Sequence, residues 1–119
     1  QTVQGVIESN RYGYDYVFSG QAGDVVTITM QAAQGSTLDT MLGLFDSASV
    51  DAQPLVTNDD MAPGNYNSQI VYTLPATGQY WIYATRYNGQ DGTSTGAFTL
   101  SLTVGGAAGR LLNRPKRRR

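Results

Sequence analysis

Cysteine and histidine are both absent from the sequence. Without them the chain cannot hold a disulfide, a zinc or haem site with thiolate or imidazole ligands, or a Ser–His–Asp or Cys–His catalytic arrangement. Glutamate occurs only at Glu8, and no pair of acids can be picked out by its spacing for glycoside hydrolysis. These absences predict that the protein is not an enzyme.

Charged side chains are also scarce, at 14% of the residues against about 25% in typical soluble domains. Thr, Ser, Gly, Asn and Gln take their place, a composition that suits a β-rich extracellular surface. No apolar run is long enough to cross a membrane, and no signal peptide precedes Gln1. We expect a secreted or cell-surface protein of bacterial or archaeal origin, either with its signal peptide removed or cut from a longer chain.

Alternation of polar and apolar residues with a period of two dominates the chain, and no helical period is sustained. Short strands separated by turns are typical of a β-sandwich or barrel. We predict an all-β fold, a two-sheet antiparallel β-sandwich of seven or eight strands, at about residues 2–8, 12–19, 24–32, 40–45, 55–56, 70–74, 80–85 and 97–104. The expected core residues are Tyr16, Phe18, Val26, Ile28, Leu42, Leu44, Ile70, Tyr72, Tyr80, Ile82, Phe98, Leu100 and Leu102.

The net charge of −1 hides an uneven distribution. Residues 1–109 hold all nine acids and only two cations, Arg11 and Arg86, which gives that part a charge of −7. The other six cations lie in residues 110–119 and are Arg110, Arg114, Lys116, Arg117, Arg118 and Arg119. We therefore divide the chain into a sandwich domain, residues 1–104, and a Gly-rich hinge with a polybasic tail, residues 105–119.

Three interpretations of this tail remain open. It could bind nucleic acid or an anionic envelope through its charge, be a disordered or processed end, or dock on the acidic body of a neighbouring copy. The acidic body offers no basic groove beside the tail, so we expect no dedicated nucleic-acid site. Docking between copies is a heterologous contact, which builds an open chain of subunits unless the rotation closes.

A group of loop residues with oxygen-bearing side chains is the candidate ion site. Ca²⁺ takes six to eight hard oxygen ligands, which loop carboxylates and carbonyls can supply. The alternative is ordinary turn chemistry, in which Asn and Asp bond to their own backbone. The candidate ligands are Asp39, Asp46, Asn58, Asp59 and Asp60, and no other cofactor is expected.

Aromatic side chains are the candidate contact residues. Trp81 and Tyr83 alternate with the expected core residues Tyr80 and Ile82, and Tyr87 lies in the loop that follows. Trp81, Tyr83 and Tyr87 could therefore stack on a sugar ring or on a partner chain. The alternative is that they form cross-strand aromatic pairs that stabilise a sheet.

Several short motifs, in their order along residues 5–104, resemble the bacterial pre-peptidase C-terminal domain family. They are Tyr14-Asp15-Tyr16-x-Phe18, Ala22-Gly23-Asp24-Val25-Val26-Thr27-Ile28, Leu38-Asp39, Leu42-x-Leu44-Phe45-Asp46, Asn58-Asp59-Asp60, Ser68-x-Ile70-x-Tyr72, Leu74-Pro75-Ala76-Thr77-Gly78-x-Tyr80 and Gly96-x-Phe98-x-Leu100. The resemblance implies a jelly-roll-like β-sandwich, of the kind appended to secreted peptidases and other exported enzymes. It also implies a role in substrate attachment, secretion or maturation, with Ca²⁺ bound in some members.

Two functions are compatible with these features. The first is a non-catalytic subunit that self-associates into an extracellular or cell-surface assembly, such as a filament. In that case the N-terminal residues 1–8 are our candidate for a strand added to a neighbour's sheet. The alternative is an accessory domain that binds protein or polysaccharide for a secreted peptidase or other exported enzyme.

Overall fold

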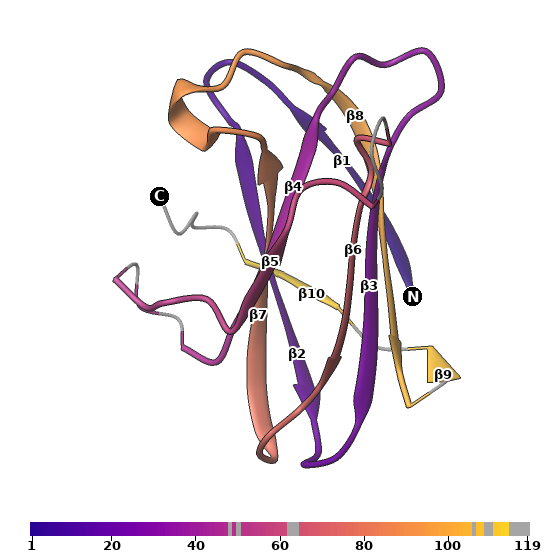
Figure 1. The fold of residues 1–119 in the computed structure, drawn as a ribbon, viewed down its shortest axis with the longest axis vertical. Helices are drawn as coiled ribbons and strands as arrows, with labels where there is room; N and C mark the ends of the chain where they lie inside the picture. Colours follow the sequence, from indigo (N-terminus) through magenta and orange to yellow (C-terminus); the bar gives the residue numbers. More distant parts are fainter. Residues whose placement is uncertain (48, 50, 62–64, 106, 109–110, 115–119) are drawn as a thin grey trace.

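The computed structural model describes residues 1–119 except 48, 50, 62–64, 106, 109–110 and 115–119. The described residues form ten β-strands and one short 3-10 helix (Figure 1). The elements are β1 (Thr2–Ile7), β2 (Gly13–Gly20), β3 (Val25–Ala32), β4 (Thr40–Phe45), β5 (Val56–Asn58), β6 (Ser68–Thr73), β7 (Gly78–Arg86), η1 (Gly89–Asp91), β8 (Gly96–Val104), β9 (Ala107–Ala108) and β10 (Leu112–Arg114). Nothing helical in this described part is long and apolar enough to span a membrane.

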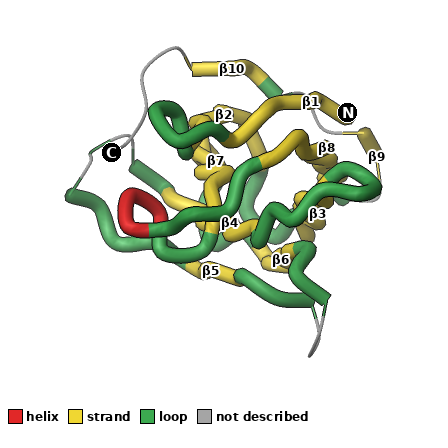
Figure 2. Tube along the Cα trace, turned by 90° about the horizontal axis from the view of Figure 1, so that it is seen from above, coloured by secondary structure: helices red, strands yellow, loops and turns green. Residues whose placement is uncertain are grey.

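The strands form two antiparallel sheets that pack face to face (Figures 1 and 2). The first sheet has the order β1-β8-β3-β6, and β9 pairs with the end of β8. The second sheet has the order β10-β2-β7-β4-β5. The predicted two-sheet sandwich is therefore confirmed, with two short strands, β9 and β10, beyond those expected.

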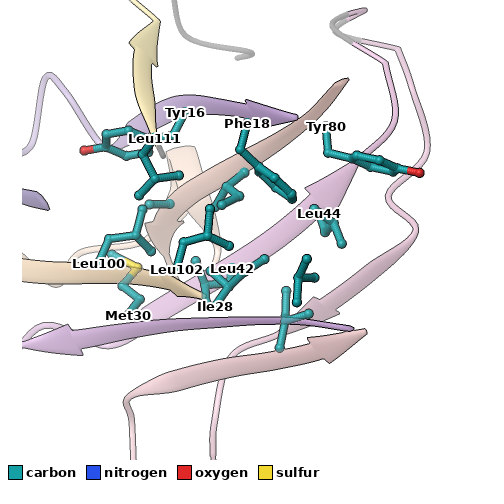
Figure 3. Packing of buried hydrophobic residues seen from close by; sticks show 14 of the residues in the cluster. Tyr16, Phe18, Ile28, Met30, Leu42, Leu44, Tyr80, Leu100, Leu102 and Leu111 are labelled. Carbon is teal, nitrogen blue, oxygen red and sulfur yellow. The ribbon is translucent and has the colours of Figure 1, made fainter. Parts of the chain in front are cut away.

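Alternation along each strand places one set of side chains between the sheets (Figure 3). Every expected core residue is buried there except Tyr72, which is half-buried on the edge strand β6. The rings of Phe18 and Tyr80 stack in this layer with centroids 5.7 Å apart. Each fully buried Leu or Ile side chain contributes about 1.5–3 kcal/mol of transfer free energy, so this layer is the main source of stability.

The turn between β6 and β7 shows why the Leu74–Tyr80 motif has its sequence. The Tyr80 hydroxyl donates a hydrogen bond to the carbonyl oxygen of Ala76, at 2.5 Å. Thr77 Oγ1 accepts a hydrogen bond from the backbone N–H of Ala22 in the neighbouring β2–β3 turn, at 2.9 Å. These side chains supply partners for turn backbone, and they join the two turns at one end of the sandwich.

The two ends of the described chain meet at one side of the sandwich. β1 pairs with β8 of the same chain, so the N-terminal strand fills its own sheet and the expected addition to a neighbour is wrong for this structure. Gln1 Oε1 accepts a hydrogen bond from the backbone N–H of Leu111 at 2.7 Å, and the side chain of Leu111 is buried in the core cluster. The segment expected to be a hinge and tail is thus partly folded into the sandwich, since β10 also pairs with β2.

Candidate functional site

The five candidate calcium ligands do not form one site. Asp39 lies just before β4 and Asp46 just after it, so the extended strand between them holds them about 23 Å apart at about 3.3 Å per residue. Asn58 Oδ1 already accepts a hydrogen bond from the backbone N–H of Gln69, at 3.1 Å. In the part of the chain that is described, no three acidic side chains lie where they could hold a metal ion. The set of five is therefore wrong as a single site.

Asp59 and Asp60 do influence Asp39. β5 runs antiparallel to β4, so the residues that follow β5 run toward the Asp39 end of β4. Burial raises the pKa of the Asp39 carboxyl above its ordinary value, and the negative charges of Asp60 and Asp59 raise this pKa further. Asp39 Oδ1 is itself buried without a hydrogen-bond partner. Calcium binding at this end of β4 stays a prediction.

The three candidate aromatic residues differ in exposure. Tyr83 is buried, with 7% of its surface exposed, whereas Tyr87 is 49% exposed. Trp81 is half-buried, and its Nε1 donor is enclosed without a hydrogen-bond partner. Only Tyr87 is therefore a freely accessible surface residue. Of the basic candidates, Arg114 lies in β10 opposite Asp15, and Arg110, Lys116, Arg117, Arg118 and Arg119 lie outside the described residues.

The outer face of the second sheet, which points away from the core, is largely covered. Phe45 and Tyr83 are buried on this face although both alternate with core residues along their strands. Two glycines make room for their rings. A Cβ atom at Gly43 would come within 2.9 Å of the Phe45 ring, and one at Gly13 would clash with Tyr83. The rings therefore pack against backbone that carries no side chain, as glycine in a strand permits.

A partly enclosed pocket of about 310 Å³ opens on this outer face. Its apolar lining comes mainly from Tyr12, Met41, Phe45, Pro54 and Tyr83. The described lining includes no charged residue, and its polar residues include Thr57, Thr85, Asn88 and Gln90. A mostly apolar cavity with a few polar groups is the usual form of a small-ligand site.

Arg86 holds the loop beside this pocket. Its side chain is buried, with Nε donating to the carbonyl oxygen of Gly89 at 2.8 Å and Nη1 to that of Ser94 at 3.2 Å. The guanidinium also lies 5.4 Å from the centroid of the Tyr12 ring, which lines the pocket. A cation–π contact of this kind contributes about 0.5–2 kcal/mol. One buried cation thus fixes both the η1 loop and an aromatic wall.

Two other surface hollows have a different lining. The one beside the β2–β3 and β6–β7 turns, of about 490 Å³, includes the acidic residue Asp24 and no aromatic side chain. The one at the end of β1, of about 420 Å³, includes the acidic residue Glu8 and again no aromatic side chain. Among these three, the outer-face pocket alone combines aromatic walls with an uncharged lining.

Comparison with solved structures identifies the fold. The pre-peptidase C-terminal domain of collagenase from Bacillus anthracis superposes with a TM-score of 0.66 over 87% of this chain and 88% of that one, at 16% identity. The chain has the fold of a pre-peptidase C-terminal domain. The periplasmic g-type lysozyme inhibitor PliG of Aeromonas hydrophila shares it, with a TM-score of 0.65 at 18% identity over 87% of this chain and 84% of that one. No protein-family model and no curated protein sequence matches the chain.

A third structure, the Yersinia pseudotuberculosis-derived mitogen, has a TM-score of 0.55 at 16% identity over 87% of this chain and 83% of that one. The pre-peptidase C-terminal fold thus recurs at low sequence identity. A likeness at this level of identity shows the fold alone. The function of the site must be inferred from this chain's own residues.

Most of the pocket lies outside the motifs that resemble the pre-peptidase C-terminal family. Met41, Thr57, Asn88 and Gln90 belong to none of those motifs, and sequence reasoning missed them. One signal was available: Gly43 interrupts an otherwise apolar strand, and glycine inside a strand often marks a close approach of another group. The position of Asn88 could not be inferred, because it depends on how Arg86 folds the η1 loop.

Proposed function

We propose that this chain is a non-catalytic binding domain of an exported protein, which attaches its host to an extracellular macromolecule. The observation that carries the proposal is the uncharged, aromatic pocket on the outer face of the second sheet. Its described lining includes no Asp, Glu, Lys or Arg, and the whole chain has no His or Cys. The described lining therefore offers binding surface without a carboxylate, amine, imidazole or thiol for catalysis.

The similar structures support an exported, non-catalytic role. One is the pre-peptidase C-terminal domain of a collagenase, and another is a periplasmic lysozyme inhibitor. Neither of these proteins is named as a catalytic domain. The low content of charged residues and the absence of Cys in this chain agree with that role.

Retention of the folded chain on insoluble extracellular polymers tests the proposal. The panel is collagen, chitin, cellulose and bacterial peptidoglycan, and serum albumin is the non-binding control protein. We expect saturable retention on at least one polymer. Folded protein that stays in the supernatant with every polymer at physiological salt would contradict the proposal.

The charge distribution favours a second candidate, self-association through the basic C-terminal residues. Residues 1–109 carry −7 and residues 110–119 carry +6, so one copy offers a charge complement to the next. Exposed pairs contribute at most about 1 kcal/mol each, so such an assembly would weaken steeply with salt. Sedimentation velocity at low and high salt, on the full chain and on a chain ending at residue 114, tests it. A monomer at low salt and high concentration would contradict it.

A further inference from the structure

We propose that the outer-face pocket binds one ring of a neutral sugar. This inference rests on the proposed binding function and names the ligand class of that same pocket. The observations behind it are the absence of charge in the lining, the division of the pocket into an apolar floor and a polar rim, and the rigid support of the rim.

The lining selects for a neutral ligand. No charged residue lines the pocket among the described residues, and the nearby guanidinium of Arg86 is already bonded to two carbonyl oxygens. A charged ligand would lose its hydration on entry without gaining an opposite charge, which is costly in a partly enclosed site. Uronic acids, phosphates and amines are therefore disfavoured.

The pocket has two chemically different parts. Its aromatic and apolar lining residues include Tyr12 and Met41, which are half-buried, and Phe45, which is buried and packs over Gly43. Its polar groups include the amides of Asn88 and Gln90, which each donate and accept hydrogen bonds. A sugar ring has the complementary halves, a face of C–H groups and a margin of hydroxyls that also donate and accept. A purely apolar ligand would gain no hydrogen bond from these exposed amides, which would stay bonded to water.

The rim is held in place before any ligand arrives. Asn88 adopts a left-handed backbone conformation, with φ 66°, and its side chain makes no capping bond to η1. The backbone N–H of Asp91 donates to the Asn88 carbonyl oxygen at 2.9 Å, and Arg86 binds the next carbonyl. The backbone of this loop is thus held in place, while the exposed side-chain amide of Asn88 makes no capping bond to η1 and is available to a ligand. A loop ordered in advance lowers the entropy that binding costs.

The size of the pocket favours a single ring over a peptide. At about 310 Å³ it lies at the lower end of the range for small-molecule sites, which is about 300–1,000 Å³. Peptide recognition instead uses an elongated groove or a sheet edge, with a row of side-chain pockets. One ring of a polysaccharide could enter while the rest of the polymer stays outside.

Ligand-observed saturation-transfer NMR on the full chain tests the inference. The probes are the methyl glycosides of glucose, galactose, mannose and N-acetylglucosamine, with glucuronic acid as the charged comparison. We expect transfer to the ring C–H protons of at least one neutral glycoside and none to glucuronic acid. Titration should then show that N88G and Q90A each weaken binding about tenfold, because each removes one hydrogen-bonding amide. Glycine suits the left-handed conformation at residue 88 without strain.

The control variant is Q79A, which removes an exposed amide from the larger, acidic hollow and should leave sugar binding unchanged. Retention on a polymer of the panel without binding of any neutral glycoside would overturn the sugar inference and leave the proposed function standing. Glycoside binding that survives both N88G and Q90A would overturn this pocket as its site. Failure of polymers and glycosides alike would overturn both.

Discussion

At the scale of single residues, two glycines shape the outer face of the second sheet. Gly13 and Gly43 carry no side chain, and the rings of Tyr83 and Phe45 occupy the space that a side chain would fill. The pocket floor therefore depends on what is missing from the strands as much as on the aromatic residues themselves. A sequence pattern that classifies residues only as polar or apolar does not detect this requirement for glycine.

Replacing Gly13 by alanine should destabilise the domain. The new Cβ would clash with the Tyr83 side chain, and relief of such overpacking typically costs about 1–3 kcal/mol. Urea unfolding followed by tryptophan fluorescence measures the change. Gly78→Ala is the matched control, because a Cβ there meets nothing within 4 Å. Equal stability losses in the two variants would contradict the steric account.

Asp39→Asn should raise the melting temperature at neutral pH in the presence of EDTA. Burial and the charges of Asp60 and Asp59 raise the pKa of Asp39 in the folded state, so its ionisation opposes folding once the pH exceeds that value. The contribution of Asp39 to the free energy of unfolding is therefore largest at low pH, where its carboxyl is neutral, and it falls as the pH rises through the raised pKa. The advantage of the variant should therefore vanish near pH 3.

The variant Asp39→Asn also tests whether calcium binds at this site. If Ca²⁺ binds at the Asp39 end of β4, it should raise the melting temperature of the unmodified chain and should raise that of Asp39→Asn much less. Thermal melts of both proteins with Ca²⁺ and with EDTA measure this. Superimposed melts of the unmodified chain under the two conditions would reject the ion.

Tyr16 should make stability fall with pH in the alkaline range. Burial raises the pKa of its hydroxyl to about 12, and the neighbouring Tyr14 adds to this shift. Between pH 10 and 12 the unfolded chain loses this proton while the folded chain keeps it, so unfolding becomes easier by up to about 1.4 kcal/mol per pH unit. The dependence should be weaker in Tyr16→Phe. Identical pH profiles of the two proteins would contradict the assignment.

At the scale of elements, β10 closes the edge of the second sheet next to β2. Because Leu111, just before this strand, is buried in the core cluster, the C-terminal segment is tied to the sandwich by packing as well as by backbone pairing. Edge strands with unpaired N–H and C=O groups are prone to pair with other chains. Covering β2 in this way removes one such edge.

Leu111→Ala should test that attachment. Truncating a buried leucine typically lowers the free energy of unfolding by about 2–5 kcal/mol. We expect the lower end of this range, because Leu111 lies near the surface with 5% of its area exposed. Chemical denaturation of the variant measures the loss, and a chain ending at residue 114 should keep the stability of the full chain. A variant as stable as the parent would mean that the segment contributes no packing energy.

At the scale of the whole molecule, the sandwich and nearly all of its core could be predicted, because period-two alternation reports directly which side chains face inward. Tyr72 is the exception, since it lies on an edge strand where less chain covers it. β10 could not be predicted, because residues 112–114 are too few to show alternation and stand among basic residues.

The candidate site was harder to predict than the fold. Asp39 and Asp46 are close in sequence, yet an extended strand carries them to opposite ends of the sheet. Tyr83 faces outward as expected but is buried, because strand period fixes the face of a residue and not what covers it. The pocket joins β4, β5, β7 and the η1 loop, and that combination depends on sheet order, which local patterns do not encode.

The contact between Gln1 and Leu111 has a mechanical consequence. The first residue and the residue before β10 are joined by one hydrogen bond, so a force that pulls on both would act across a short path at one side of the sandwich. The rest of the two sheets would lie outside that path and would bear little of the load until this hydrogen bond breaks.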